Sequence, residues 1–239
     1  QRQMCIRDRF KLACKVSAKR LFPNFSFLDA PFNLAFYQEG NYKTEVGYMG
    51  CRTRVMANVY DKTREITCGR GNLSFTSINL PRLAIKANGD VDKFFDMLDE
   101  KLDLVVEQLL DRLEIQSKKR AKNYPFLMQQ GVWLDSEKLN PEDEVREVLK
   151  HGTLTAGFIG LAETLKALIG KHHGESAEAQ ELGLSIVSHM RERMDRESEK
   201  RGLNFSLIAT PAEGLSGRFV RMDREKYGVI EGVTDRAVS

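Results

Sequence analysis

Stretches of β-type sequence that alternate with long helical patterns constrain the fold of this chain most strongly. Runs rich in β-branched and aromatic residues occur at 72–80 (NLSFTSINL), 153–160 (TLTAGFIG) and 204–210 (NFSLIAT). Apolar residues recur at helical spacing from Val91 to about Lys122, and shorter patterns of this kind follow each later run. This order predicts parallel β/α units, in which functional side chains gather in the loops after the strands.

The residues at the ends of these patterns set the expected bounds of the elements. Asp90 and Ser176 are predicted helix N-caps, and Gly202 is predicted to end the last long helix. Weaker patterns predict further helices over 9–21, 140–152 and 161–170, a short strand over 32–37, and loops over 40–55 and 211–219. No linker or internal repeat divides the chain.

Charge and hydropathy exclude several classes of protein. The 37 basic and 34 acidic residues leave a net charge of +3, which is too balanced to indicate a nucleic-acid partner. The longest apolar-rich run, 154–170, contains Glu163 and Lys166 and is too short to span a bilayer, so no membrane partner is expected. No secretory signal is found, so we predict a cytoplasmic protein without disulfides.

The cysteines and histidines form no metal-binding pattern. Cysteines at 5, 14, 51 and 68 match no zinc or Cys-X-X-Cys spacing, and the four histidines supply no ligand set. We therefore predict no metal site. Cys14 is expected to pack on an apolar helix face, Cys68 has no specific predicted role, and His172–His173 is expected in a solvated link.

Three loops carry candidate chemistry. After a predicted strand, ATPAEGLSGRF (209–219) combines hydroxyls, glycines and Arg218, which suit a phosphate cradle, although a simple helix cap would have the same composition. CGRGNL (68–73), which contains Asn72, taken alone indicates a simple turn. In YMGCRTRV (48–55), Cys51 has no neighbouring base, so a Cys–His nucleophile is not indicated. A packed thiol and a one-electron role in a dry, defined position both remain open.

Four ordered stretches resemble the anaerobic (class III) ribonucleoside-triphosphate reductases, which are glycyl-radical enzymes. These stretches are YMGCRTRV, GRGN with TSINLPRLAI, HGTLTAGFIGLAETL and NFSLIATPAEGLSGRF, and the resemblance covers 9–236. It implies an α/β fold that is part of a ten-stranded α/β barrel, truncated here, with a central finger loop that carries Cys51. Residues 1–8 are expected to be an artefactual leader, because MCIRDR resembles translated adapter sequence, and 237–239 a tail outside the family pattern.

The resemblance also implies roles for individual residues. A glycyl radical on a separate C-terminal segment would oxidise Cys51 to a thiyl radical, which takes the 3′-hydrogen of a ribonucleoside triphosphate. Asn72 would bond the ribose hydroxyls. Thr53 stands where the aerobic relatives have a glutamate, which is consistent with formate as reductant, and a thioredoxin-type thiol remains open. The implied substrate-binding residues are Thr53, Thr210, Pro211, Ala212, Glu213, Gly214, Leu215 and Ser216.

The implied partners are a radical-SAM activating enzyme, ATP and deoxynucleotide effectors, and a second copy of the chain. The ATP-sensing region, the other barrel half, a four-cysteine zinc site and the radical glycine are expected outside this sequence, so the chain alone is expected to reduce no nucleotide. Two alternatives stay open. One is a different glycyl-radical enzyme that acts on a small carbon acid, and the other is an inactive remnant with a packed Cys51 and a turn-forming Asn72.

Overall fold

A three-stranded parallel sheet lies at the centre of the computed structural model, which describes residues 2–20, 22, 23, 25–49 and 53–235. The strand order is β3 (Asn72–Asn79), β4 (Thr153–Ile159) and β5 (Asn204–Ala209). Thr153 of β4 pairs with the first residue of each neighbouring strand, Asn72 of β3 and Asn204 of β5. The predicted parallel β/α units are confirmed.

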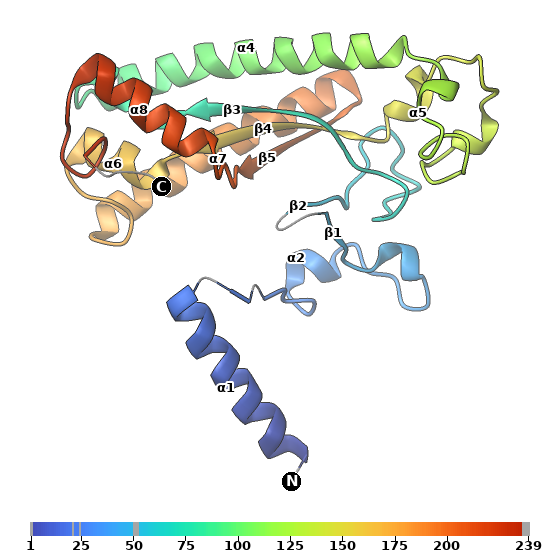
Figure 1. Cartoon of the computed structure of the whole chain (residues 1–239), viewed down its shortest axis with the longest axis horizontal. Helices are drawn as coiled ribbons and strands as arrows, with labels where there is room; N and C mark the ends of the chain where they lie inside the picture. The colour runs from blue at the N-terminus through green and yellow to red at the C-terminus, as the bar shows by residue number, and fades with distance from the viewer. Residues whose placement is uncertain (1, 21, 24, 50–52, 236–239) are drawn as a thin grey trace.

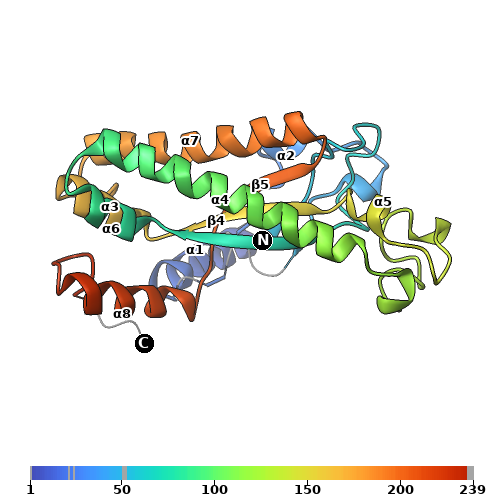
Figure 2. The same ribbon diagram turned by 90° about the horizontal axis from the view of Figure 1, so that it is seen from above.

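Two long helices cover one face of this sheet (Figures 1 and 2). Helix α4 (Val91–Ser117) packs against β3 and β4, and α7 (Ala177–Arg201) packs against β5. Helices α3 (Leu80–Ala87) and α6 (Leu161–Ile169) pack together beyond the carboxyl ends of the strands. Alternation along β4 sends every second side chain into this core, whose fully buried members include Leu98, Leu102, Leu109, Leu154, Ala156, Ile186, Met190 and Met194.

The predicted caps of the long helices are confirmed. The Asp90 side chain accepts from the backbone N–H of Lys93, and that of Ser176 accepts from Ala179. Gly202 ends α7 in the left-handed region, at φ 61°, where glycine avoids the steric cost of a Cβ atom. None of the described helices is long and apolar enough to cross a membrane.

Two predicted helix boundaries are wrong, and contacts with distant chain explain both. Helix α5 covers only Arg146–Leu149, not 140–152, because the carbonyls of Pro141 and Asp143 accept from residues 122 and 121 instead of from a following helical turn. Helix α4 ends at Ser117 rather than near 122, because the chain leaves it to pair residue 120 with Glu144.

The amino-terminal region also departs from expectation. The strand predicted over 32–37 is helix α2 (Pro31–Leu34), whose first turn suits the fixed φ of proline. Helix α1 spans Arg2–Arg20, so it begins before residue 9, and it projects away from the sheet (Figure 1). Cys14 is exposed on it rather than packed, because α1 has no described core to contact.

Short elements complete the described chain. Residues 40–55, predicted as a loop, contain the 3₁₀ turn η1 (Tyr42–Thr44) and an antiparallel pair, β1 (Tyr48–Met49) with β2 (Thr53–Arg54). Further 3₁₀ turns are η2 (Ala121–Asn123) and η3 (Ser136–Lys138), and the loop predicted over 211–219 gives way to helix α8 (Leu215–Tyr227).

Candidate active site

The sheet face turned away from α4 and α7 carries a row of polar side chains. On β4, Thr153, Thr155 and Gly157 alternate with the core residues of that strand. The Thr155 hydroxyl shares a hydrogen bond of 2.8 Å with Ser206 on β5. Helices α4 and α7 thus bury one face of the sheet. The opposite face carries hydroxyl and amide groups.

Asn72 is held at the start of this row. Its Oδ1 atom accepts from the hydroxyls of Thr153 and, at 3.2 Å, of Thr155. No described residue accepts from its Nδ2 group, and the side chain is exposed. The candidate catalytic amide is therefore oriented by two threonines and keeps a free donor for a ligand.

A pocket of about 490 Å³ joins Asn72 to the β1–β2 pair. Its walls include the predicted site residues Thr53 and Asn72 and the segment 69–71, which has two glycines. The remaining wall is apolar and is formed by Leu127, Val132 and Trp133. Figure 1 shows the β1–β2 pair on the side of the sheet opposite α4. Cys51 falls in the three residues between β1 and β2, outside the described residues, so its predicted role stays a prediction.

The other predicted binding segment, 210–216, follows β5 at the opposite end of the polar row. The Thr210 backbone N–H donates to Phe158 at 3.0 Å, and its hydroxyl bonds Ser77 Oγ at 2.7 Å. Pro211, Glu213 and Gly214 are exposed, and Ala212 has a left-handed φ of 54°.

Leu215 and Ser216 form the first turn of α8, which no side chain caps. The amide groups at this helix start are suited to bind an anion. Four residue steps separate Thr153 from Gly157, so the row from Asn72 to Thr210 is roughly 13 Å long at the rise of a β-strand.

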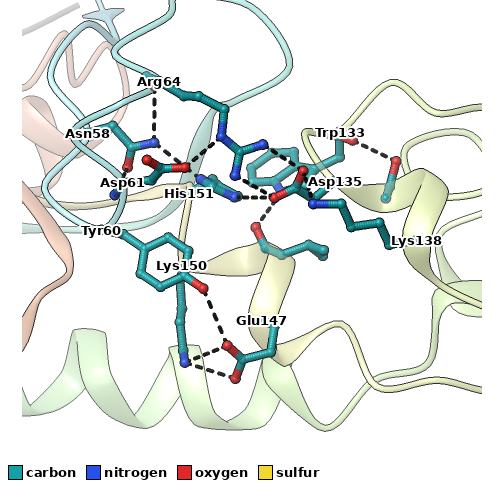
Figure 3. A network of polar contacts seen from close by, with 12 residues as sticks. Asn58, Tyr60, Asp61, Arg64, Trp133, Asp135, Lys138, Glu147, Lys150 and His151 are labelled. Atoms are coloured by element: carbon teal, nitrogen blue, oxygen red, sulfur yellow. Dashed lines mark hydrogen bonds and ion pairs between the residues drawn. The ribbon is translucent and has the colours of Figure 1, made fainter.

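Sequence patterns gave no sign of a partly buried polar network beside this pocket (Figure 3). Arg64 donates to both carboxylate oxygens of Asp135, at 2.6 and 2.7 Å, and His151 Nε2 lies 3.0 Å from the same carboxylate. On its other side, His151 Nδ1 lies 3.2 Å from Asn58 Nδ2. Because Arg64 and Asp135 are far apart in sequence, no local spacing could have revealed the pair.

The charges in this network are set by burial and pairing. Hydrogen bonds from Arg64 hold the pKa of Asp135 well below its usual value. Burial lowers the pKa of His151 despite the opposing effect of Asp135. His151 is therefore neutral, donates from Nε2 to the carboxylate and accepts at Nδ1 from the Asn58 amide.

Arg70 connects the network to the pocket. Its guanidinium is buried and donates to four backbone carbonyls, those of Met56, Ala57, Ile66 and His151, at 2.9 to 3.2 Å. Burial lowers the pKa of Arg70 to about 10, so the cation persists at neutral pH. The segment that leads from β2 to Asn72 is thereby fixed against the start of β4.

Cys68 and Arg54 do not line this pocket. Cys68 is exposed and has no disulfide partner among the described residues. Arg54, on β2, places its guanidinium carbon 4.7 Å from the centre of the Phe32 ring. Arg52 lies outside the described residues.

Comparison with known proteins identifies the family of this chain. A family model described as anaerobic ribonucleoside-triphosphate reductase matches residues 1–238. The chain belongs to this family. The anaerobic ribonucleoside-triphosphate reductase of Escherichia coli (strain K12) is 34% identical over 232 residues, which make up 96% of this chain and 31% of that protein.

Solved structures of this reductase family share the fold. The anaerobic ribonucleotide reductase from Thermotoga maritima with MES in the active site matches with a TM-score of 0.59 and 18% identity, over 78% of this chain and 28% of that one. The same reductase in complex with dATP and CTP gives a TM-score of 0.52 and 19% identity, over 73% and 28% of the two chains. The chain spans about a third of the length of the curated relatives it matches.

Proposed function

We propose that this chain forms part of the catalytic barrel of an enzyme that reduces ribonucleoside triphosphates to deoxyribonucleoside triphosphates by thiyl-radical chemistry. The pocket that joins Asn72 to Thr53, two residues after Cys51, carries this proposal. Family membership supports it. In this proposal β3, β4 and β5 are three of ten barrel strands, and the β1–β2 pair with Cys51 is the finger loop.

Cys51 supplies the reacting sulfur. A glycyl radical on a segment outside this chain supplies the one-electron oxidation of the thiol. The Cys51 sulfur then takes the 3′-hydrogen atom of the ribose, and the 2′-hydroxyl leaves as water after it gains a proton. Formate, which becomes carbon dioxide, or a pair of thiols, which becomes a disulfide, supplies two electrons and one proton. The proton taken up by the 2′-hydroxyl comes from solvent or from the second thiol, and the Cys51 thiol returns its hydrogen atom to C3′.

The described residues provide the positioning that such chemistry needs. The Nδ2 group of Asn72, oriented by Thr153 and Thr155, donates to a ribose hydroxyl. Leu127, Val132 and Trp133 give the pocket an apolar side. The segment 210–216 binds the phosphates through its hydroxyls and the amide groups at the start of α8.

The proposed substrate and regulators are nucleotides. The related reductase from Thermotoga maritima has been solved in complex with dATP and CTP. We extend this to a ribonucleoside triphosphate substrate and to ATP and deoxynucleotide effectors. A radical-SAM activating enzyme, a homodimeric assembly and a cytoplasmic location complete the proposal.

The test is substitution in the full-length enzyme that contains this chain. With Cys51→Ser, we expect the glycyl radical to form and CTP to bind, but no deoxynucleotide to appear. Cys68→Ser is the matched control, because that exposed thiol lies four residues before Asn72 and should leave turnover unchanged. Retained turnover in Cys51→Ser would refute the assignment.

A further inference from the structure

The loop 210–216 is tied to strand β3 on both sides. At its start, the Thr210 hydroxyl bonds Ser77 at 2.7 Å. Beyond its end, helix α8 returns to the last residue of the same strand, where Asn79 Nδ2 donates to Asp223 Oδ2 at 2.7 Å. Figure 1 shows α8 beside this end of the sheet. The strand that begins at the candidate catalytic asparagine thus holds both sides of the candidate phosphate loop.

Asp223 differs from the rest of α8 in its burial. Of the residues of this helix, all of which the structure describes, Asp223 alone is buried, with 2% of its surface exposed. Each carboxylate oxygen has a donor, because Arg82 Nε lies 2.5 Å from Oδ1 while Asn79 bonds Oδ2. A buried carboxylate is unfavourable without such partners, so the contact strongly favours one placement of α8.

Asn79 links this contact to the corner between β3 and α3. Its Oδ1 atom accepts from the backbone N–H of Arg82 at 3.3 Å and so caps α3. That bond orients the amide, and Nδ2 is left to face Asp223. The three side chains form one unit that joins a strand end, a helix start and α8.

We propose that Asp223, Asn79 and Arg82 form a clamp that sets the position of the phosphate-binding loop through the rigid helix α8. This inference rests on the proposed function, in which residues 210–216 bind substrate phosphates. Asp223 is a positioning residue, because it lies eight residues beyond the helix start, about 12 Å along the axis at 1.5 Å per residue. A tilt of α8 would move the amide groups at its start relative to Asn72.

A paired set of variants isolates the clamp from general stability. Asn79→Asp keeps an oxygen that caps α3 but turns the donor toward Asp223 into a second carboxylate oxygen. The double variant Asn79→Asp, Asp223→Asn exchanges amide and carboxylate, so that one donor again faces one acceptor. Glu225→Gln is the matched control, because it removes an exposed carboxylate from the same helix.

Two quantities are measured for each variant of the full-length enzyme that contains this chain. They are the calorimetric binding of inorganic tripolyphosphate and the hydrogen exchange of amides 212–217. We expect Asn79→Asp to weaken binding about tenfold and to speed exchange of these amides by at least about the same factor, as loss of a charge-assisted hydrogen bond predicts. The double variant should restore both values, exchange in β4 should not change, and Glu225→Gln should resemble the unmodified enzyme.

Three results would overturn the clamp. These are unchanged exchange at 212–217 in Asn79→Asp, equal acceleration in β4, or a double variant that is no better than the single one. An unmodified full-length enzyme that binds no tripolyphosphate would instead refute the phosphate assignment of the proposed function. The exchange comparison still decides the clamp in that case, because it needs no ligand.

Discussion

Replacing Gly157 with alanine should loosen the contact that fixes the start of the loop 210–216. A Cβ atom built on Gly157 would clash with Thr210 Oγ1 and lie 2.7 Å from Ser77 Oγ. These two hydroxyls bond each other over the glycine at 2.7 Å. Ser77 is on a paired strand and Thr210 extends the ladder of β5, so neither backbone can move away freely.

The magnitude combines three contributions to the free energy of unfolding. Overpacking of a buried position costs about 1–3 kcal/mol, and loss of the bond between the hydroxyls costs about 1 kcal/mol. Alanine lowers the conformational entropy of the unfolded chain relative to glycine, which offsets about 0.5–1 kcal/mol of this loss of stability. The net loss of about 1–3.5 kcal/mol should lower the melting temperature by roughly 2–14 °C for a chain of this size.

The assay is urea unfolding followed by circular dichroism. Gly47→Ala is the matched control, because an added Cβ there meets no atom within 4 Å. In a double-mutant cycle, Thr210→Ala should recover part of the loss in Gly157→Ala, because it removes the atom that clashes. Equal stability of the Gly157→Ala and Gly47→Ala variants, or strict additivity in the cycle, would refute the reasoning.

Three further predictions concern buried charge and helix capping. Burial lowers the pKa of His151 from 6.5, so below about pH 6.5 the unfolded chain binds a proton that the folded protein does not, and stability should fall by up to about 1.4 kcal/mol per pH unit. Urea titrations at several pH values should show this slope, and His151→Gln should flatten it. Arg70→Met leaves four carbonyls without their donor and should cost more than about 3 kcal/mol in urea unfolding, with Arg70→Lys recovering only part. Asp90→Ala should lose about 1 kcal/mol and Asp90→Ser almost nothing in thermal unfolding, because both aspartate and serine cap helices.

The elements that sequence predicts well are those whose signals are local. Strands β3, β4 and β5 and helices α4, α6 and α7 follow from periodicity, and Asp90 and Ser176 show their caps in adjacent residues. The start of α5 could not be predicted this way, because Asp143 satisfies its carbonyl with Ala121 on another segment. Helix α8 was hidden by Pro211 and Gly214, which precede it, and by Gly217 in its first turn.

Some residues of the candidate site could be identified from the sequence, and others could not. Asn72 and Thr53 were identified only through the family resemblance, and the structure brings both to one pocket. The supporting network could not be predicted, because its contacts join Arg64 to Asp135, and Asn58 to His151, across long sequence separations. Neither pair has a spacing that a helix or strand would produce. Cys51 rests on the family resemblance, since it lies outside the described residues.

The four bonds of Arg70 imply an order of assembly. Its guanidinium gathers carbonyls from residues 56, 57 and 66, which are near in sequence, and from His151, which is 81 positions away. Closing so long a loop is entropically costly until the intervening helix α4 has formed and carried β4 alongside β3. The segment 56–66 is therefore expected to lock against the start of β4 only after the sheet has formed.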